Sequence, residues 1–245
     1  MKSWILTYHS LDVSGSVISV DPAVFRQHMS WLAQTGTQVV PLERIFESPG
    51  AVALTFDDGF RNFYELAFPV LQQYRFPATV FVVTGYCAGK NDWPSQPALP
   101  HVPTLPLMNW SELQNLAAAG IDLGSHTINH SRMATLSDAD TERELRASQE
   151  AIEDRTGKPV MSFAYPYGES TPQIREAVRK RFRVACGTKL AYVSPESDPA
   201  ELPRLDTFYL QEKLWFEALG KQYGAAYIAA RSALRELRSS WNKRH

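Results

Sequence analysis

The sequence predicts an α/β protein with a parallel sheet, either open or closed into a barrel. Two observations support this class. Strand-like and helix-like patterns alternate along most of the chain, as they do in βαβ units. The length of 245 residues suits one such domain, and no internal repeat, low-complexity tract or convincing linker divides it.

Six short β-type runs predict the strands, and the signals between them predict helices. The predicted strands are residues 4–8, 51–56, 78–83, 121–124, 162–164 and 184–186. Asp21 is a predicted N-cap with Pro22 in the first turn, and Gly36 ends that helix. A helix at residues 62–74 is predicted to kink at Pro69. Another begins at the capping pair Asn109 and Glu112 and ends at Gly120. Two more are predicted, one from Ser137 to Gly157 and one at residues 172–181.

Residues 85–109 form a long connection that is rich in proline. The prolines are Pro94, Pro97, Pro100, Pro103 and Pro106. A loop of this length inside a compact domain is more often a functional lid or rim than a spacer. We therefore expect this segment to border a functional site.

Charge and cysteine content narrow the class of protein. Lys and Arg number 25 against 26 Asp and Glu, so nothing favours nucleic acid as the main partner. Cys87 and Cys186 lie in or beside apolar stretches and predict two reduced, buried thiols and no disulfide. The N-terminal apolar run is too short for a signal peptide, and no stretch is long enough to span a membrane, which predicts a cytoplasmic protein.

Polar side chains follow four of the predicted strands. His9 follows the first, Asp57 and Asp58 the second, the pair His126 and His130 the fourth, and Tyr167 the fifth. Functional groups of parallel α/β folds gather where strands end, so these groups are expected at one rim. Each signal is weak alone, because Asp-Asp-Gly is also an ordinary turn and His-x-x-x-His can be two polar residues on a helix.

Two imidazoles and one carboxylate suit a borderline divalent ion such as zinc, and three protein ligands leave a position open for water. Asp57 and Asp58 are neighbours, and neighbouring side chains on an extended chain diverge. One of the two is therefore expected to bind the metal while the other acts as a base. Cobalt, nickel and manganese are the alternatives to zinc.

Three motifs resemble those of the polysaccharide deacetylases, the family with the NodB-homology domain that is also called carbohydrate esterase family four. They are Thr55–Gly59, Ser125–His130 and Ala164–Gly168, and the resemblance extends from about residue 4 to 206. It implies a single distorted (β/α) barrel with parallel strands. It also implies Asp57 as general base, Asp58, His126 and His130 as metal ligands, an oxyanion contact from the backbone of Tyr167, and a substrate groove lined by Pro166, Tyr167 and Gly168.

Two departures from the family pattern change the expected roles. Ala164 stands where many members have the arginine that orients the base, and Arg204 is the predicted replacement, with a plain surface arginine as the alternative. The late Leu-x-His motif is missing, since the only histidine after His130 is His245. The chain resembles the permuted poly-N-acetylglucosamine deacetylases, in which this histidine lies near the N-terminus, so His9 is the predicted general acid.

The predicted function is metal-dependent removal of an N-acetyl group from an amino sugar of a polysaccharide or glycan intermediate, with a metal-bound water as nucleophile. The alternatives are a deacetylase or deformylase of a lipid-linked sugar and an inactive glycan-binding barrel. An aspartate-dependent phosphatase would leave His126 and His130 unexplained. An Fe(II) oxygenase is a poor fit, because the carboxylate precedes both histidines by a long interval of sequence. A zinc protease is also a poor fit, because Thr127 stands where its His-Glu-x-x-His motif needs glutamate.

The C-terminal part predicts a helical extension, residues 211–245, after a deacetylase domain of residues 1–210. Its aromatic and leucine residues alternate with basic ones, including Arg231, Arg235, Arg238, Lys243 and Arg244. Such a basic amphipathic helix predicts either weak contact with a membrane surface or simple packing on the barrel. The oligomeric state is not predicted.

Overall fold

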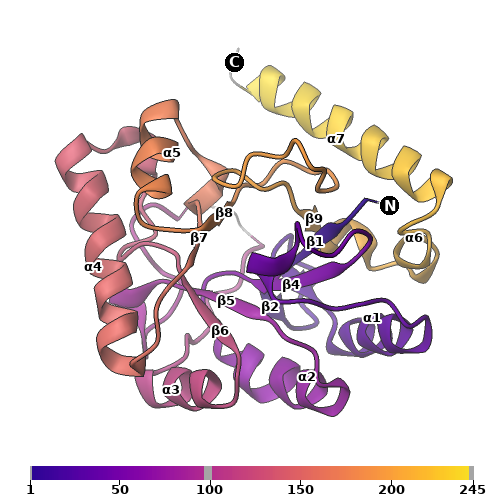
Figure 1. Cartoon of the computed structure of the whole chain (residues 1–245), viewed down its shortest axis with the longest axis horizontal. Helices are drawn as coiled ribbons and strands as arrows, with labels where there is room; N and C mark the ends of the chain where they lie inside the picture. Colours follow the sequence, from indigo (N-terminus) through magenta and orange to yellow (C-terminus); the bar gives the residue numbers. More distant parts are fainter. Residues whose placement is uncertain (1, 97–100, 243–245) are drawn as a thin grey trace.

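The computed structural model describes residues 2–96 and 101–242 of the chain. Its centre is a seven-stranded sheet in the order β8-β7-β6-β5-β4-β1-β9, and every neighbouring pair is parallel. The sheet curls into a half-barrel, and the helices lie around its outside (Figure 1). The predicted α/β class and distorted parallel barrel are confirmed.

All six predicted strands are present within a residue or two of their expected ends. The strands are β1 (Trp4–Tyr8), β2 (Ser10–Leu11), β3 (Ser19–Val20), β4 (Val52–Phe56), β5 (Thr79–Val82), β6 (Asp122–Ser125), β7 (Ser162–Ala164), β8 (Val184–Cys186) and β9 (Leu205–Asp206). The three strands that the sequence did not predict, β2, β3 and β9, have only two residues each. Two residues are too few to show a periodic pattern.

The helices begin and end largely where capping residues indicated. They are α1 (Pro22–Gln34), α2 (Phe68–Tyr74), α3 (Trp110–Ala118), α4 (Asp138–Thr156), α5 (Pro172–Arg179), α6 (Lys213–Glu217) and α7 (Gln222–Asn242). The Asp21 side chain accepts from the Ala23 amide, and Asn109 with Glu112 forms a complete capping box. Gly157 ends α4 in the left-handed conformation.

The single kinked helix predicted for residues 62–74 is wrong in detail. The chain forms a π-helical segment, Phe63–Ala67, that continues into α2. Pro69 lies in the first turn of α2, where it has no amide hydrogen to donate to the preceding turn. The wider π turn before it accommodates this missing hydrogen bond, so the break takes the form of a change in helix type.

The segment from Pro199 to Asp206 contains the edge strand β9, which pairs with β1, and also lies against β8 at the other edge of the sheet. The Leu202 amide donates to the Ala185 carbonyl at 2.7 Å, and the Gly187 amide donates to Leu202 at 2.9 Å. Further along, Leu205 pairs with Leu6 of β1. This one stretch therefore brings the edges of the curled sheet together, and it carries Arg204 between its two contacts.

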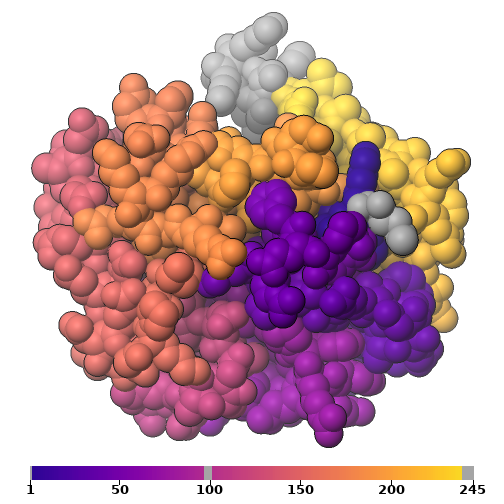
Figure 2. Space-filling view, viewed as in Figure 1, coloured from indigo at the N-terminus to yellow at the C-terminus, as the bar shows by residue number. Residues whose placement is uncertain are grey.

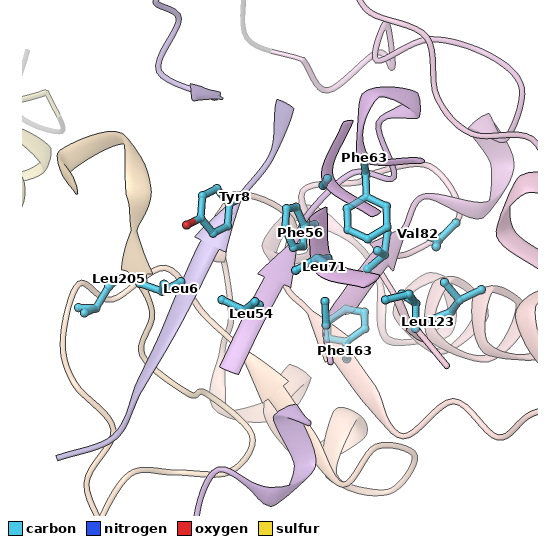
Figure 3. Close-up of a cluster of buried hydrophobic side chains, with 14 of the residues drawn as sticks. Leu6, Tyr8, Leu54, Phe56, Phe63, Leu71, Val82, Leu123, Phe163 and Leu205 are labelled. Atoms are coloured by element: carbon cyan, nitrogen blue, oxygen red, sulfur yellow. The ribbon is translucent and has the colours of Figure 1, made fainter. Parts of the chain in front are cut away.

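Alternating side chains of the strands form two apolar layers, one on each face of the sheet. Leu6, Leu54 and Phe163 belong to the larger layer, which packs under the helices (Figure 3). Ile5 and Ala53, their neighbours in sequence, belong to the smaller layer on the inside of the barrel. This period of two is the expected geometry of strands that are buried on both faces.

The two thiols are free, as predicted, but they differ in burial. Cys186 is fully buried in the inner layer, whereas Cys87 is only partly buried. Burial raises the pKa of both thiols to about 12. The prediction of two buried thiols is therefore correct for Cys186 and wrong for Cys87.

The C-terminal helix α7 runs along one edge of the molecule and packs on it through its first half (Figures 1 and 2). Tyr227 stacks on Trp215 of α6 and donates a 2.7 Å hydrogen bond to the Tyr209 carbonyl. The Arg231 guanidinium lies over the rings of Tyr209 and Tyr227, so this basic side chain faces the barrel. These contacts favour packing on the barrel over the membrane-surface alternative for the first half of the helix.

The second half of α7 exposes apolar side chains, with Leu237 68% accessible. Lys243, Arg244 and His245 lie outside the described residues, as do Pro97 and Pro100 of the long loop. Within the part of the chain that the structure describes, no helix is both long and apolar enough to cross a bilayer. Membrane contact and cytoplasmic location remain predictions from the sequence.

Replacing Leu205 with alanine should lower the free energy of unfolding by about 2–5 kcal/mol, because it leaves a cavity where the barrel closes. Leu205 is 0% exposed, whereas Leu237 of α7 is exposed. The Leu237→Ala variant is the matched control and should change stability by less than about 0.5 kcal/mol. Urea denaturation measures both, and equal effects would contradict the closing role of this strand.

Candidate active site

The predicted polar residues gather at the carboxyl ends of the strands. His9 follows β1, Asp57 and Asp58 follow β4, and His126 and His130 follow β6. All five line one pocket of about 170 Å³. The convergence follows from the parallel register, in which Tyr8 pairs with Phe56 and the strand ends share one rim.

Asp58, His126 and His130 form a cluster that suits a metal ion. Oδ1 of Asp58 lies 3.3 Å from Nε2 of His126 and 3.3 Å from Nε2 of His130. All three side chains are buried, and one donor atom from each lies within 4.8 Å of the others. Within residues 2–96 and 101–242, Asp58 Oδ1 has no hydrogen-bond partner despite its burial. A buried carboxylate oxygen that faces two imidazole nitrogens without a hydrogen bond fits a divalent cation.

The two histidines are held in different ways. Nδ1 of His126 lies 2.8 Å from the Ala164 carbonyl, which can only accept, so Nδ1 carries the proton and Nε2 keeps its lone pair toward Asp58. Nδ1 of His130 is buried and has no such partner. Its ring instead lies between two aromatic rings, stacked on Trp93 at 4.2 Å and edge-on to Tyr167 at 4.6 Å.

Burial and mutual charge set the protonation of this cluster. Burial by itself would raise the pKa of Asp58, but the two imidazoles that face it hold that pKa well below its usual range. Burial lowers the pKa of His130, and the nearby Asp58 only partly opposes this. An ionised carboxylate and a neutral imidazole are the forms that bind a metal.

Four non-glycine residues at this site have left-handed backbone conformations. Asp58 has φ 72°, Thr127 68°, His130 51° and Tyr167 59°. Such conformations cost about 1–3 kcal/mol each outside glycine and persist only where the surroundings impose them. They rule out the alternative that His126 and His130 lie on one helix face, because the chain between them bends at Thr127.

Glu144 of α4 holds the loop that carries the two histidines. Its Oε2 accepts from the amides of Ile128 and Asn129 at 2.7 and 3.1 Å, and its Oε1 accepts from the Asn129 side chain at 2.7 Å. The carboxylate is 2% exposed. Glu144 was not predicted from the sequence, since a glutamate within a polar helix has the pattern of any solvated side chain.

Arg204 forms a buried, bidentate ion pair with Asp57. Nη1 and Nη2 lie 2.6 and 2.7 Å from the two carboxylate oxygens, and Nε donates to the Gly187 carbonyl at 2.9 Å. Both side chains are almost fully buried, so Arg204 is not the surface arginine of the alternative interpretation. Burial would raise the pKa of Asp57, but the adjacent guanidinium lowers it below the usual value.

His9 lies on the open side of the same carboxylate. Its Nε2 is 3.7 Å from Asp57 Oδ2, and its side chain is 25% exposed. The ring therefore reaches both the pocket and solvent. Asp57 consequently stands between a buried cation on one side and a solvent-connected imidazole on the other.

Some residues of the third motif line the pocket, and others support the turn that carries them. Tyr167 lines the pocket, together with Tyr165. Pro166 is buried in the short turn before Tyr167, and Gly168 supports the turn: its φ is 70°, and a Cβ there would meet Thr188 at 2.0 Å. Neither Pro166 nor Gly168 is among the described residues that line the cavity.

The long loop that was predicted as a rim covers this pocket. Its residues 86–96 and 101–108 are called the strap below. Asn91, Trp93, Gln96 and Val102 line the cavity from it. Asn91 joins the two limbs, because its side chain accepts from the Leu105 amide and donates to the Pro103 carbonyl. The length and the prolines of this segment predicted that it borders the site, but nothing in the sequence singled out Trp93.

A larger cavity of about 730 Å³ lies elsewhere, between α1, α2 and α6. Its one histidine, His28, is stacked on Phe216, and both ring nitrogens are bound, by Tyr8 and by the Leu210 carbonyl. Burial lowers the pKa of His28 to about 3, so the ring is neutral. The cluster of potential ligands and bases lies in the smaller pocket, which is therefore the candidate active site.

A parallel barrel with a buried Asp-His-His cluster and a second, oriented carboxylate is an arrangement typical of metal-dependent hydrolases. The chain belongs to the polysaccharide deacetylase family, whose model matches residues 47–181. This family assignment favours the deacetylase prediction over the phosphatase, oxygenase and protease alternatives.

Curated relatives share modest identity with the chain. It is 27% identical over 184 residues to a putative polysaccharide deacetylase, YxkH, of Bacillus subtilis, a match that covers 72% of this chain and 60% of that protein. It is 25% identical over 221 residues to poly-beta-1,6-N-acetyl-D-glucosamine N-deacetylase of Staphylococcus aureus, covering 80% of this chain and 72% of the relative. The chain thus spans less than two thirds of the length of YxkH.

Solved structures show the same fold. A deacetylase of Streptococcus pyogenes, PplD, in complex with acetate superposes with a TM-score of 0.72 at 22% identity, covering 84% of this chain and 92% of that one. IcaB from Ammonifex degensii gives 0.72 at 24% identity, covering 89% and 97%. At these identities the likeness establishes the architecture and not the chemistry.

Arg204→Met should destabilise the metal-free protein by about 3–5 kcal/mol at neutral pH, because it leaves Asp57 ionised and unpaired in the interior. The native ion pair keeps the pKa of Asp57 low, so its stabilisation is present above the unfolded-state value of about 3.9 and is lost as the pH falls through the folded-state value. Without Arg204, burial raises the pKa of Asp57, so the variant takes up a proton at a higher pH than the wild type does, and its deficit should shrink as the pH falls.

Urea denaturation between pH 3 and pH 7 measures this difference. Arg204→Lys keeps the charge but not the two parallel hydrogen bonds, so it should recover part of the loss. The matched control is Arg44→Met, whose pair with Glu47 is exposed and should contribute less than about 1 kcal/mol. A deficit for Arg204→Met that is independent of pH would show that Asp57 is not the group it stabilises.

Proposed function

We propose that the protein is a metal-dependent hydrolase that removes the N-acetyl group from an amino sugar of a polysaccharide or glycan intermediate. One observation carries this proposal: a carboxylate oriented by Arg204 stands directly beside a separate Asp-His-His cluster in the same pocket. Family membership supports the reaction class.

Asp58, His126 and His130 would hold the metal. A divalent ion bound there would act as a Lewis acid on the acetamido carbonyl and lower the pKa of water to about 7. Zinc is the first candidate for this ligand set, with cobalt, nickel and manganese as alternatives. The buried ligand atoms are already close together, so little rearrangement is needed for binding.

Asp57 is the proposed general base. Arg204 takes one lone pair on each carboxylate oxygen, and every such oxygen has a second. The guanidinium also fixes the plane of the carboxylate and keeps it ionised, because it lowers the pKa of Asp57. A base that is ionised and oriented before substrate arrives can take a proton from water without reorganising.

His9 is the proposed general acid. Its Nε2 lies 3.7 Å from Asp57 Oδ2, and its partial exposure allows the ring to regain a proton from solvent after each turnover. A separate acid is needed because an amine anion is a poor leaving group, and protonation of the nitrogen allows the C–N bond to break. The products are acetate and a free amino sugar.

Tyr167 is proposed to serve the substrate in two ways. Its ring lines the cavity, where it can contact a sugar face, and its backbone N–H would support the developing oxyanion. Pro166 and Gly168 are proposed to shape the neighbouring groove. The left-handed conformation of Tyr167 is a local feature that a transition-state contact would explain.

The first substrate to test is a β-1,6-linked N-acetylglucosamine oligomer, since the Staphylococcus aureus relative carries this activity in its name. Lipid-linked N-acetylated and N-formylated sugars are the alternatives. An inactive glycan-binding barrel would bind these oligomers and release no acid. Acyl-group release measured across this panel separates the four cases.

Asp57→Asn should abolish acetate release while the metal stays bound, because the ligands are unchanged. His126→Ala should lose both activity and metal, and treatment with a chelator should mimic it. Elemental analysis and an acetate assay on the same preparations measure the two properties. The control is Asp198→Asn, which changes a carboxylate outside the pocket that pairs with Arg179 and accepts a hydrogen bond from the Ala200 amide. An active Asp57→Asn enzyme would exclude the proposed base.

His9→Gln should lower turnover of the amide substrate by about 10²–10⁴-fold and remove the alkaline limb of the pH–rate profile. The defect should be far smaller with 4-nitrophenyl acetate, whose phenolate leaves without protonation. The matched control is His101→Gln, on the exposed part of the strap. Equal defects on the two substrates would show that His9 does not protonate a leaving group.

A further inference from the structure

We propose that Trp93 is a positioning residue for the metal centre, and that its stacking on His130 replaces the hydrogen bond that a metal-binding histidine usually makes with its second nitrogen. The proposal rests on the function proposed above. It assigns a role to the strap in metal binding, in addition to covering the pocket.

The two histidines of the cluster differ in a way that requires explanation. Metal-binding histidines almost always donate their other ring N–H to a carboxylate, carbonyl or water, which fixes the orientation of the ring. His126 follows this rule through the Ala164 carbonyl at 2.8 Å. Nδ1 of His130 is buried and has no hydrogen-bond partner among the residues that the structure describes. Some other contact must therefore hold the His130 ring toward Asp58.

Aromatic rings supply that contact. The Trp93 indole stacks on His130 with 4.2 Å between ring centroids and 28° between planes. Tyr167 meets the same ring edge-on at 4.6 Å and 79°. Stacking resists tilting of the imidazole plane, and the Tyr167 contact resists sliding, so the two together fix the ring that lies 3.3 Å from Asp58 Oδ1.

Trp93 is itself firmly held, which a positioning residue needs. It is 2% exposed and packs in a separate apolar cluster with Phe60, Val83 and Leu107. Two residues further along the strap, the Ser95 hydroxyl donates to the His130 carbonyl at 2.6 Å. The strap therefore contacts this ligand at both its side chain and its backbone, the latter in the left-handed conformation with φ 51°.

The chemistry of stacking favours an aromatic residue over an apolar one of similar size. A ligating imidazole loses electron density to the cation, and the electron-rich face of an indole attracts an electron-poor ring. The stack should therefore be stronger in the metal-bound protein than in the free one. An aliphatic side chain could fill the space but would supply no such preference.

The test compares aromatic and aliphatic replacements of Trp93 in the full chain. Zn²⁺ affinity is measured by competition calorimetry on the metal-free protein. Trp93→Leu and Trp93→Met should bind Zn²⁺ about 10-fold to 100-fold more weakly, the loss typical of a missing outer contact to a metal ligand. Trp93→Phe should stay within about threefold of the wild type, since it keeps the ring.

Two controls separate positioning from general damage. Trp215→Leu removes another stacked indole, 4.0 Å from Tyr227 and outside the pocket, and should leave Zn²⁺ affinity unchanged. Urea denaturation of each metal-free variant shows whether Trp93→Leu and Trp93→Phe have comparable stability. A loss of affinity in the aliphatic variants that Trp93→Phe reverses at comparable stability supports positioning by the ring.

The outcomes distinguish this proposal from the function on which it rests. If His130→Ala binds Zn²⁺ as tightly as the wild type, the metal centre is wrong and both proposals fall. If His130→Ala weakens binding but Trp93→Leu and Trp93→Met do not, only the role of Trp93 is overturned. If Trp93→Phe loses as much affinity as the aliphatic variants, the ring is not what positions His130.

Discussion

The buried ion pair between Asp57 and Arg204 joins the closure of the barrel to its chemistry. The two residues are 147 positions apart in sequence, and neither charge could stay in the interior without the other. Arg204 reaches Asp57 because the segment that carries it bridges β8 and β1. A buried pair of this kind contributes little net stability, since desolvation offsets attraction, but it fixes the geometry of a carboxylate in a way that water could not.

The same pair gives two adjacent aspartates different surroundings. Asp57 has a full positive charge against both oxygens, whereas Asp58 faces two imidazoles and has a buried oxygen without a hydrogen bond. The charge of Asp57 is therefore balanced within the protein, and that of Asp58 is left for a bound cation to balance. Asp58 has a left-handed backbone conformation, and its carboxylate faces His126 and His130 while that of Asp57 faces Arg204.

The ligands are held by contacts from several directions. Glu144 binds the loop amides from α4, the Ala164 carbonyl orients His126 from β7, and the strap packs Trp93 and Ser95 against His130. These contacts support a loop whose backbone would otherwise relax from its left-handed conformations. A site preorganised in this way loses little entropy when it binds a metal or substrate.

The sequence by itself determined the six main strands, most helix ends and the set of Asp57, Asp58, His126 and His130, because those signals lie within a few consecutive residues. A capping box, or a strand followed by a polar residue, is a pattern of neighbouring residues, and the structure that it predicts forms among those same residues. The tertiary structure alone decided that Arg204 is buried, that the two-residue strand β9 pairs with β1 where the barrel closes, and that Glu144 and Trp93 contact the histidine loop. Those features depend on contacts between distant segments, and the patterns of a single sequence do not record which distant side chains will meet.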